Sequence, residues 1–309
     1  MVEGLCRERR ALMIDLGNLT TEARNPNTMN LDKMSPQEIV DVMNSEDNRV
    51  VMAVYAERKH IATAVSWAAE AISNGGRILY VGAGTSGRLG VLDAVECPPT
   101  FGVSPDLVVG LIAGGNSAFV RAKEGAEDSS TLGAKELDEV DVCERDLVIG
   151  LAASGRTPYV IGALRRARKV GARTVAIACN ANSEIGREAE LAIEPVTGPE
   201  VLTGSTRLKA GTAEKMILNM ISTGAMVLNG KAYQNLMVDV KQSNEKLVVR
   251  AQNITMEATG CSRQQAVEAL NEASGSSKVA IVMLLTGANA DQAREKLENA
   301  RGRVRRAVE

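Results

Sequence analysis

Five apolar runs that alternate with helical stretches constrain the fold of this chain more than any other feature. Valine, isoleucine and leucine dominate the runs, which lie at residues 77–81, 107–112, 147–152, 173–178 and 191–194. Strands that are apolar along their whole length are typical of a parallel sheet with helices on both faces. The sequence therefore predicts an α/β fold, a three-layer αβα sandwich around a central parallel sheet.

Helix signals flank these runs. Ser35-Pro36 with Glu38 is a strong helix start, and Asn74-Gly75-Gly76 ends a second helix expected over residues 50–73. Further helices are expected at 88–95, 117–123, 158–170, 183–189 and 205–228. Short helices at 246–258, 262–273, 277–285 and 290–300 then predict a small helical, UBA-like C-terminal domain. We expect an irregular and helical segment at 1–48, the sheet domain at 49–243 and the helical domain at 244–309.

The composition excludes several classes of protein. A net charge of −2 and 2% aromatic residues give no reason to expect nucleic-acid binding or attachment to an anionic membrane. No secretory signal or uncharged apolar run of about 18 residues occurs. The five cysteines are scattered, with no Cys-x-x-Cys pair, which predicts free thiols and a cytoplasmic protein. The only histidine, His60, lies beside Arg58 and Lys59 on a predicted solvated helix face, so neither a histidine metal site nor a Ser-His-Asp triad is expected.

The first apolar run leads directly into a glycine-rich turn, Gly82-Ala-Gly-Thr-Ser-Gly87, and then a helix. Unpaired N–H groups at a helix start and close backbone approach suit a phosphate. The glycines also satisfy the dinucleotide pattern G-x-G-x-x-G, which needs an acidic residue at the end of the next strand. That strand ends in Gly114-Gly115-Asn116 instead. With Thr85 and Ser86 as hydroxyl donors, a monophosphate is the better interpretation.

The third apolar run is followed by a similar turn, Ser154-Gly155-Arg156-Thr157, ahead of Pro158. Two such turns at one sheet edge could hold one phosphate, although Ser154 or Thr157 could instead cap a helix. A third hydroxyl-rich segment, residues 203–212, could complete the site or only cap the long helix. Because histidine is scarce, acid–base groups are to be sought among carboxylates, lysines and tyrosines. Two carboxylate segments lie toward the strand-end side of the sheet, with Glu96, expected near the first turn, and Glu127; from the residues alone each could equally belong to a solvated face.

At these residues the chain resembles the N-acetylmuramic acid 6-phosphate etherases, members of the sugar isomerase (SIS) superfamily. The matching segments are residues 81–100, 110–115, 124–129, 152–159, 203–212, 235–240 and 253–261. The resemblance covers nearly the whole chain, and the block that runs on from Thr85 to Thr100 is far more specific than a glycine pattern. Glucokinase regulatory protein shares the phosphate turns but is larger.

The resemblance implies a SIS fold, a homodimer, no metal and no cofactor. It implies a sugar phosphate substrate whose D-lactyl ether is removed, as part of the catabolism of N-acetylmuramate and the recycling of peptidoglycan. Glu96 and Glu127 match the two catalytic glutamates of the family. The phosphosugar-contacting positions match Thr85, Ser86, Ser154, Gly155, Arg156 and Thr157.

These residue types fit an elimination. In the open-chain sugar the C2 proton lies α to the aldehyde, so a carboxylate can remove it while an acid protonates the departing ether oxygen. We expect Glu96 to be the acid and Glu127 the base. Two other functions remain open: a phosphosugar isomerase of the same fold, which releases no lactate, and a non-catalytic phosphosugar sensor that binds without turnover.

Overall fold

The computed structural model describes residues 19–121, 123–242 and 244–309. At its centre is a five-stranded, all-parallel sheet with strand order β2-β1-β3-β4-β5. The strands are β1 (Ile78–Gly82), β2 (Val108–Ile112), β3 (Leu147–Leu151), β4 (Arg173–Ile177) and β5 (Leu191–Ile193). Each predicted strand is confirmed to within one residue at either end. The continuous apolar runs specify these strands because both faces of the sheet are covered.

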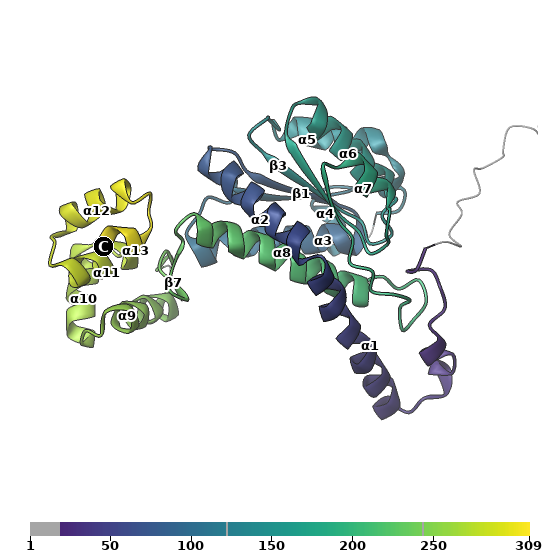
Figure 1. Cartoon of the computed structure of the whole chain (residues 1–309), viewed down its shortest axis with the longest axis horizontal. Helices are drawn as coiled ribbons and strands as arrows, with labels where there is room; N and C mark the ends of the chain where they lie inside the picture. Colours follow the sequence, from purple (N-terminus) through teal and green to yellow (C-terminus); the bar gives the residue numbers. More distant parts are fainter. Residues whose placement is uncertain (1–18, 122, 243) are drawn as a thin grey trace, which may run out of the picture.

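Helices form a layer on each face of the sheet (Figure 1). On one face, α2 (Arg58–Ser73), α3 (Gly84–Phe101) and α8 (Lys209–Leu228) share an apolar cluster with alternate strand residues such as Tyr80 and Ile149. On the other, α5 (Ser130–Glu139), α6 (Pro158–Lys169) and α7 (Glu184–Glu188) pack against Leu79 and Val148. The predicted three-layer sandwich is therefore confirmed.

Several helix predictions need correction. The helix expected over residues 50–73 is two helices, because α1 runs over Pro36–Ala56 and α2 begins at Arg58. The helix start predicted at Ser35-Pro36 is confirmed as that of α1, where Ser35 and Glu38 form a capping box. Helix α3 is much longer than the predicted 88–95 and ends only where Gly102 adopts a left-handed φ of 67°. The helix expected at 117–123 ends earlier, as α4 (Ser117–Val120), while α5 was not predicted at all.

Beyond α8 the chain forms a short antiparallel hairpin, β6 (Ala232–Tyr233) with β7 (Leu236–Met237), and then a cluster of helices. Figure 1 shows that cluster beyond one end of α8, away from the sheet. Its members are α9 (Glu245–Thr259), α10 (Arg263–Glu272), α11 (Ser277–Thr286), α12 (Ala290–Asn299) and α13 (Val304–Val308). They bury an apolar cluster of their own around Ala280 and Ile281. The hairpin and α13 were missed by the sequence analysis, and the proposed domain limits stay a prediction.

Three simpler expectations can be compared with the described residues. Cys97, Cys143, Cys179 and Cys261 are free, while Cys6 lies outside the described part of the chain. In that part no helix is both long enough and apolar enough to cross a bilayer. His60 is exposed on α2 and contacts Glu57 Oε2 through Nδ1 at 2.7 Å, which confirms its placement on a solvated helix face.

Candidate active site

The two glycine-and-hydroxyl turns begin side by side at the carboxyl edge of the sheet. Gly82 at the end of β1 is the register partner of Leu151 at the end of β3. From β1 the chain continues through α3 on one face, and from β3 through α6 on the other. Such a divergence is a topological switch point, where parallel sheets bind their ligands. The sheet order therefore places a ligand site between the two turns.

The first turn is compact because α3 begins almost immediately after β1. Gly84 has a φ of +54° and opens the helix, and the N-cap residue Ala83 makes no side-chain cap bond. A Cβ on Gly87 would lie 2.7 Å from Gly82 O, so only glycine lets α3 approach β1 this closely. Thr85 is half-buried beside this contact, in the first turn of the helix. The start of α3 thus presents backbone N–H groups with the Thr85 hydroxyl beside them.

Ser86 is held from beneath by a residue that the sequence analysis did not identify. Its side-chain oxygen Oγ donates to Glu214 Oε1 of α8 at 2.8 Å, and both residues are buried. Glu214 Oε2 has no hydrogen-bond partner among the described residues. Burial raises the pKa of Glu214 to about 8, and the hydrogen bond from Ser86 only partly offsets this. Glutamates in helices are ordinarily solvated, so no sequence signal marked this one.

The second turn differs in how its side chains are engaged. Gly155 has a φ of +77°, and a Cβ there would lie 2.4 Å from Ser183 Cβ. Thr157 is the N-cap of α6 but makes no side-chain cap bond, so the capping alternative for its hydroxyl is wrong. Arg156 Nε donates to Glu184 Oε1 at 3.0 Å. The Thr157 hydroxyl is therefore placed at a helix start without serving that helix.

The N-terminal segment packs against the same edge of the sheet, which the sequence analysis did not anticipate. Asn180, just after β4, accepts hydrogen bonds from Thr20 N and Oγ1 at 2.8 and 2.9 Å. Its amide Nδ2 donates to Thr21 Oγ1 at 3.0 Å and to Ala153 O at 3.2 Å. Asn180 thereby connects the N-terminal segment to the backbone that leads into the second turn.

Glu127 lies beside the first turn. It is part of the short 3-10 helix η3 (Ala126–Asp128) and lines a cavity of about 180 Å³. The same cavity is lined by Gly84 at the start of α3 and by the side chains of Arg88 and Lys123. Arg88 also donates to Phe119 O and Ala118 O, which fixes the loop after β2 onto α3. A carboxylate, a helix start and two cationic side chains therefore share one opening.

Glu96 does not lie near the first turn, contrary to the expectation. Because α3 continues without a break, Glu96 is twelve positions beyond Gly84, or about 18 Å along the helix axis. It lines a separate cavity of about 240 Å³ with Asp93, Lys215 and Asn219. Asp93 accepts hydrogen bonds from Tyr80 and Ser222, and burial raises its pKa. Within one chain, the two candidate catalytic glutamates thus open into different cavities.

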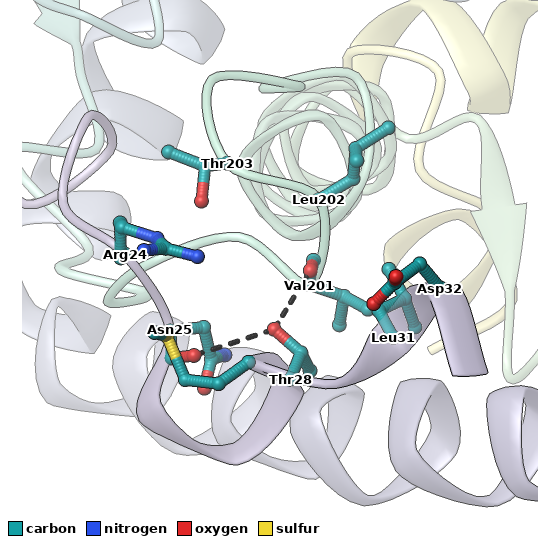
Figure 2. A pocket seen from close by; sticks show the side chains of 9 residues that line it. Arg24, Asn25, Thr28, Leu31, Asp32, Val201, Leu202 and Thr203 are labelled. Atoms are coloured by element: carbon teal, nitrogen blue, oxygen red, sulfur yellow. Dashed lines mark hydrogen bonds between the residues drawn. The ribbon is translucent and has the colours of Figure 1, made fainter. Parts of the chain in front are cut away.

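The third segment does not cap α8 with a hydroxyl, since its N-cap residue Leu208 makes no side-chain cap bond. The carboxylate of Glu200 accepts from Lys209 N and Ala210 N, both at 3.0 Å, and so caps the helix from an earlier position in the chain. Thr203 instead lines a cavity of about 470 Å³ between this segment and the N-terminal segment (Figure 2). There Thr28 Oγ1 donates to Val201 O at 2.8 Å. None of the predicted site residues lines this cavity, and whether residues 203–212 contact a ligand stays a prediction.

The described residues contain no group of three or more histidine, cysteine or acidic side chains arranged to hold a metal ion. The site consists of hydroxyls, backbone N–H groups, a few cations and carboxylates. That combination suits binding of a phosphate and proton transfer by carboxylates.

Comparison with known proteins agrees with this arrangement. Residues 60–168 match the sequence model of the glucokinase regulatory protein N-terminal SIS domain, and residues 135–223 match that of the SIS domain. The phosphoheptose isomerase from Neisseria gonorrhoeae has the same fold, with a TM-score of 0.50 at 15% identity over 62% of this chain and 98% of that chain. The parallel sheet that opens two hydroxyl turns at its switch point therefore has the SIS fold, and the matches to the two models place a SIS domain within residues 60–223.

Full-length relatives are more specific. The N-acetylmuramic acid 6-phosphate etherase of Clostridium beijerinckii is 55% identical over 96% of this chain and 97% of the relative. The etherase of Salmonella agona is 59% identical over 96% of this chain and 100% of the relative. The chain belongs to the N-acetylmuramic acid 6-phosphate etherase family, a family of carbon–oxygen lyases.

Proposed function

We propose that this protein converts N-acetylmuramic acid 6-phosphate into N-acetylglucosamine 6-phosphate and D-lactate. The observation that carries the proposal is the identity of 55–59% with two etherases over 96% of the chain. The phosphate binds between the two turns, in contact with side chains and backbone that both turns supply. The contacting residues are Thr85, Ser86, Ser154, Gly155, Arg156 and Thr157.

The reaction proceeds by elimination and then hydration. The Glu127 carboxylate removes the C2 proton of the open-chain sugar, the C3–O bond breaks, and Glu96 protonates the departing lactate oxygen. Water then adds across the C2–C3 double bond: Glu96 takes a proton from the water as its oxygen bonds to C3, and Glu127 returns a proton to C2. One glutamate must be charged and the other neutral for this sequence to start.

An assay of D-lactate release tests the proposal and the two roles. Glu96→Gln and Glu127→Gln should each lower kcat by about 10²- to 10⁴-fold, the usual contribution of a general acid or base. Only Glu127→Gln should also abolish exchange of the C2 proton in D2O. Glu139→Gln is the matched control, because Glu139 is an exposed acid paired only with Lys135. Ketose formation without lactate would identify an isomerase, and binding without turnover would identify a sensor.

We also propose that the protein is a homodimer that completes its active sites across the interface. Glu96 and Glu127 lie in separate cavities of one chain, yet the reaction needs both at one sugar. Apolar side chains are exposed on α1 and α3, the helices that flank α8, and exposed apolar patches mark interfaces. They include Met52, Tyr55, Leu92 and Val95.

Mixing two inactive variants tests the shared site. If each site takes Glu96 from one copy and Glu127 from the other, dimers reassembled from Glu96→Gln and Glu127→Gln chains regain about a quarter of wild-type activity. No recovery in verified mixed dimers, or a mass of one chain in solution, would contradict this. We further propose a cytoplasmic role in peptidoglycan recycling, supported by the free thiols among the described cysteines and tested by cell fractionation.

A further inference from the structure

Glu214 is a buried carboxyl group directly beneath the phosphate turn, and the reaction above does not use it. It lies on α8 with a side chain that is 0% exposed, and its one hydrogen-bond partner among the described residues is Ser86 at 2.8 Å. Its second oxygen has no partner among those residues. A charged carboxylate in this position would leave a negatively charged oxygen without solvent or donor, which costs far more than the neutral carbonyl oxygen that a protonated acid would leave there.

The Ser86 hydroxyl has a single hydrogen to donate. If that hydrogen is donated to a charged Glu214, Ser86 presents only lone pairs to the ligand, and a phosphate dianion offers only acceptors. Ser86 can donate to the phosphate without leaving a buried charge unbonded only when Glu214 carries a proton and donates it to Ser86 Oγ. The direction of one hydrogen bond therefore decides whether the first turn attracts or repels the phosphate.

We propose that Glu214 is a positioning residue that binds phosphosugars in its protonated form, donating to Ser86 so that the Ser86 hydrogen points at the phosphate. This rests on the proposed function, in which Ser86 contacts that phosphate. Phosphate binding is then coupled to a proton held beneath the turn rather than on the ligand. Ser86 keeps its one hydrogen and changes only its partners: it accepts from Glu214 and donates to the phosphate.

The other ionisable groups around α8 are already accounted for. Just after β4, the buried Cys179 thiol is kept neutral, because burial raises its pKa. From α1, Glu46 pairs with Lys209, and from α3, Asp93 bonds to Tyr80 and Ser222. The other charged groups of these helices point away from Glu214. Exposed to solvent are Glu38, Asp41, Asp47 and Arg49 of α1, Arg58, Lys59, His60 and Glu70 of α2, and Glu96 of α3. Arg88 bonds to the backbone of α4, and Lys215 lines the Glu96 cavity.

Burial raises the pKa of Glu214 to about 8, so the protonated form predominates at neutral pH and is lost as the pH rises through that value. The phosphate monoester stays dianionic over the same range, since its second pKa is about 6. The KM of wild-type protein should therefore rise by about tenfold per pH unit above pH 8, as expected for loss of one proton.

The experiment measures KM for lactate release, and the Kd of N-acetylglucosamine 6-phosphate, from about pH 7 to pH 9.5. In Glu214→Gln, the amide donates to Ser86 at every pH, so the alkaline rise in KM disappears. Ser86→Ala should bind weakly at every pH, and the exposed control Glu139→Gln should keep the wild-type profile. Equal alkaline profiles in wild type and Glu214→Gln would overturn the proposal.

A second measurement needs no variant. Calorimetric titration of wild-type protein with N-acetylglucosamine 6-phosphate near pH 8.5, in buffers of different ionisation enthalpy, counts the protons exchanged on binding. The proposal requires net proton uptake, and its absence would contradict the role of Glu214. Failure of the proposed function is a separate result: no lactate release by wild type, whatever the pH dependence of ligand binding.

Discussion

Glu46 and Glu214 are both buried, but their surroundings shift their pKa values in opposite directions. Glu46 bonds to Lys209 at the start of α8, and Glu214 bonds to Ser86 at the start of α3. Glu46 of α1 is bonded by Lys209 Nζ at 2.7 Å and by two asparagine side chains of the N-terminal segment. Burial raises its pKa, but these bonds outweigh burial and lower it from 4.5 to about 2. Among the described residues, Ser86 alone donates a side-chain hydrogen bond to Glu214, and burial raises the pKa of Glu214 to about 8.

The difference shows that the number of donors, and not burial alone, decides the charge of an enclosed carboxyl group. The charged Glu46 joins α1, α8 and the N-terminal segment into one framework. The neutral Glu214 keeps a hydrogen available beneath the site. One glutamate is therefore structural, and the other can respond to a ligand.

Removing the cation beside Glu46 is expected to have the largest effect. Lys209→Met leaves a buried carboxylate without its ion pair and should lower the free energy of unfolding by about 3–5 kcal/mol. Urea denaturation measures this. The exposed pair of Lys135 with Glu139 is the control, because Lys135→Met should change stability by only about 0.5 kcal/mol or less.

A double variant distinguishes a lost ion pair from a lost contact. Glu46→Leu combined with Lys209→Met removes both charges and should regain part of the stability. If Lys209→Met is no less stable than Lys135→Met, the structural role of the Glu46–Lys209 pair is wrong.

The pH dependence of stability should differ in sign between the two glutamates. The folded pKa of Glu46 lies below its unfolded value, so its contribution of about 3 kcal/mol is present above pH 4.5 and lost as the pH falls toward 2. The folded pKa of Glu214 lies above its unfolded value, so stability is lost as the pH rises from 4.5 through 8. Unfolding free energies measured across this range should therefore decline less steeply in Glu214→Gln than in wild type. If the unfolding free energies of wild type and Glu214→Gln decline in parallel over this range, the proposed pH response of Glu214 is wrong.

The smallest effects on stability are expected at the second turn. Thr157→Ala should change stability by only about 0.5 kcal/mol or less, because the hydroxyl does not cap α6. Its KM should still rise by about 10- to 100-fold, since a hydrogen bond to a charged group contributes about 1.5–3 kcal/mol. Ser262→Ala, which removes the capping box of α10, should instead cost about 1 kcal/mol without affecting KM. A stability loss in Thr157→Ala as large as in Ser262→Ala would contradict the absence of capping.

Much of the framework could be predicted from the chain because it depends on local pattern. The continuous apolar runs located every strand of the central sheet, and the order of strands and helices implied the three layers. The turns after β1 and β3 were recognisable from glycines and hydroxyls that follow apolar runs. Helix α5 was missed because Ser130–Glu139 is largely polar, with only Gly133 and Leu137 buried.

The helix that carries Glu96 shows where local pattern fails. The sequence predicted a helix over residues 88–95, yet α3 begins at Gly84 and ends only at Gly102. Because the helix runs unbroken from Gly84 through Glu96, it carries Glu96 about 18 Å along its axis from the first turn. The cap of α8 could not be assigned from the sequence either, because two of its N–H donors bond to Glu200 rather than to the hydroxyls next to the helix.

By itself the sequence determined the parallel sheet, the two glycine-and-hydroxyl turns and the types of residue available for chemistry, because apolar runs, glycines and hydroxyls act over short stretches of chain. Only the tertiary structure decided which carboxyl groups are buried and which donors they meet. Ser86 and Glu214 are 128 positions apart, and nothing in either local sequence indicates the other. Their contact arises because α3 and α8 pack on the same face of the sheet, and that packing determines the charge beneath the phosphate turn.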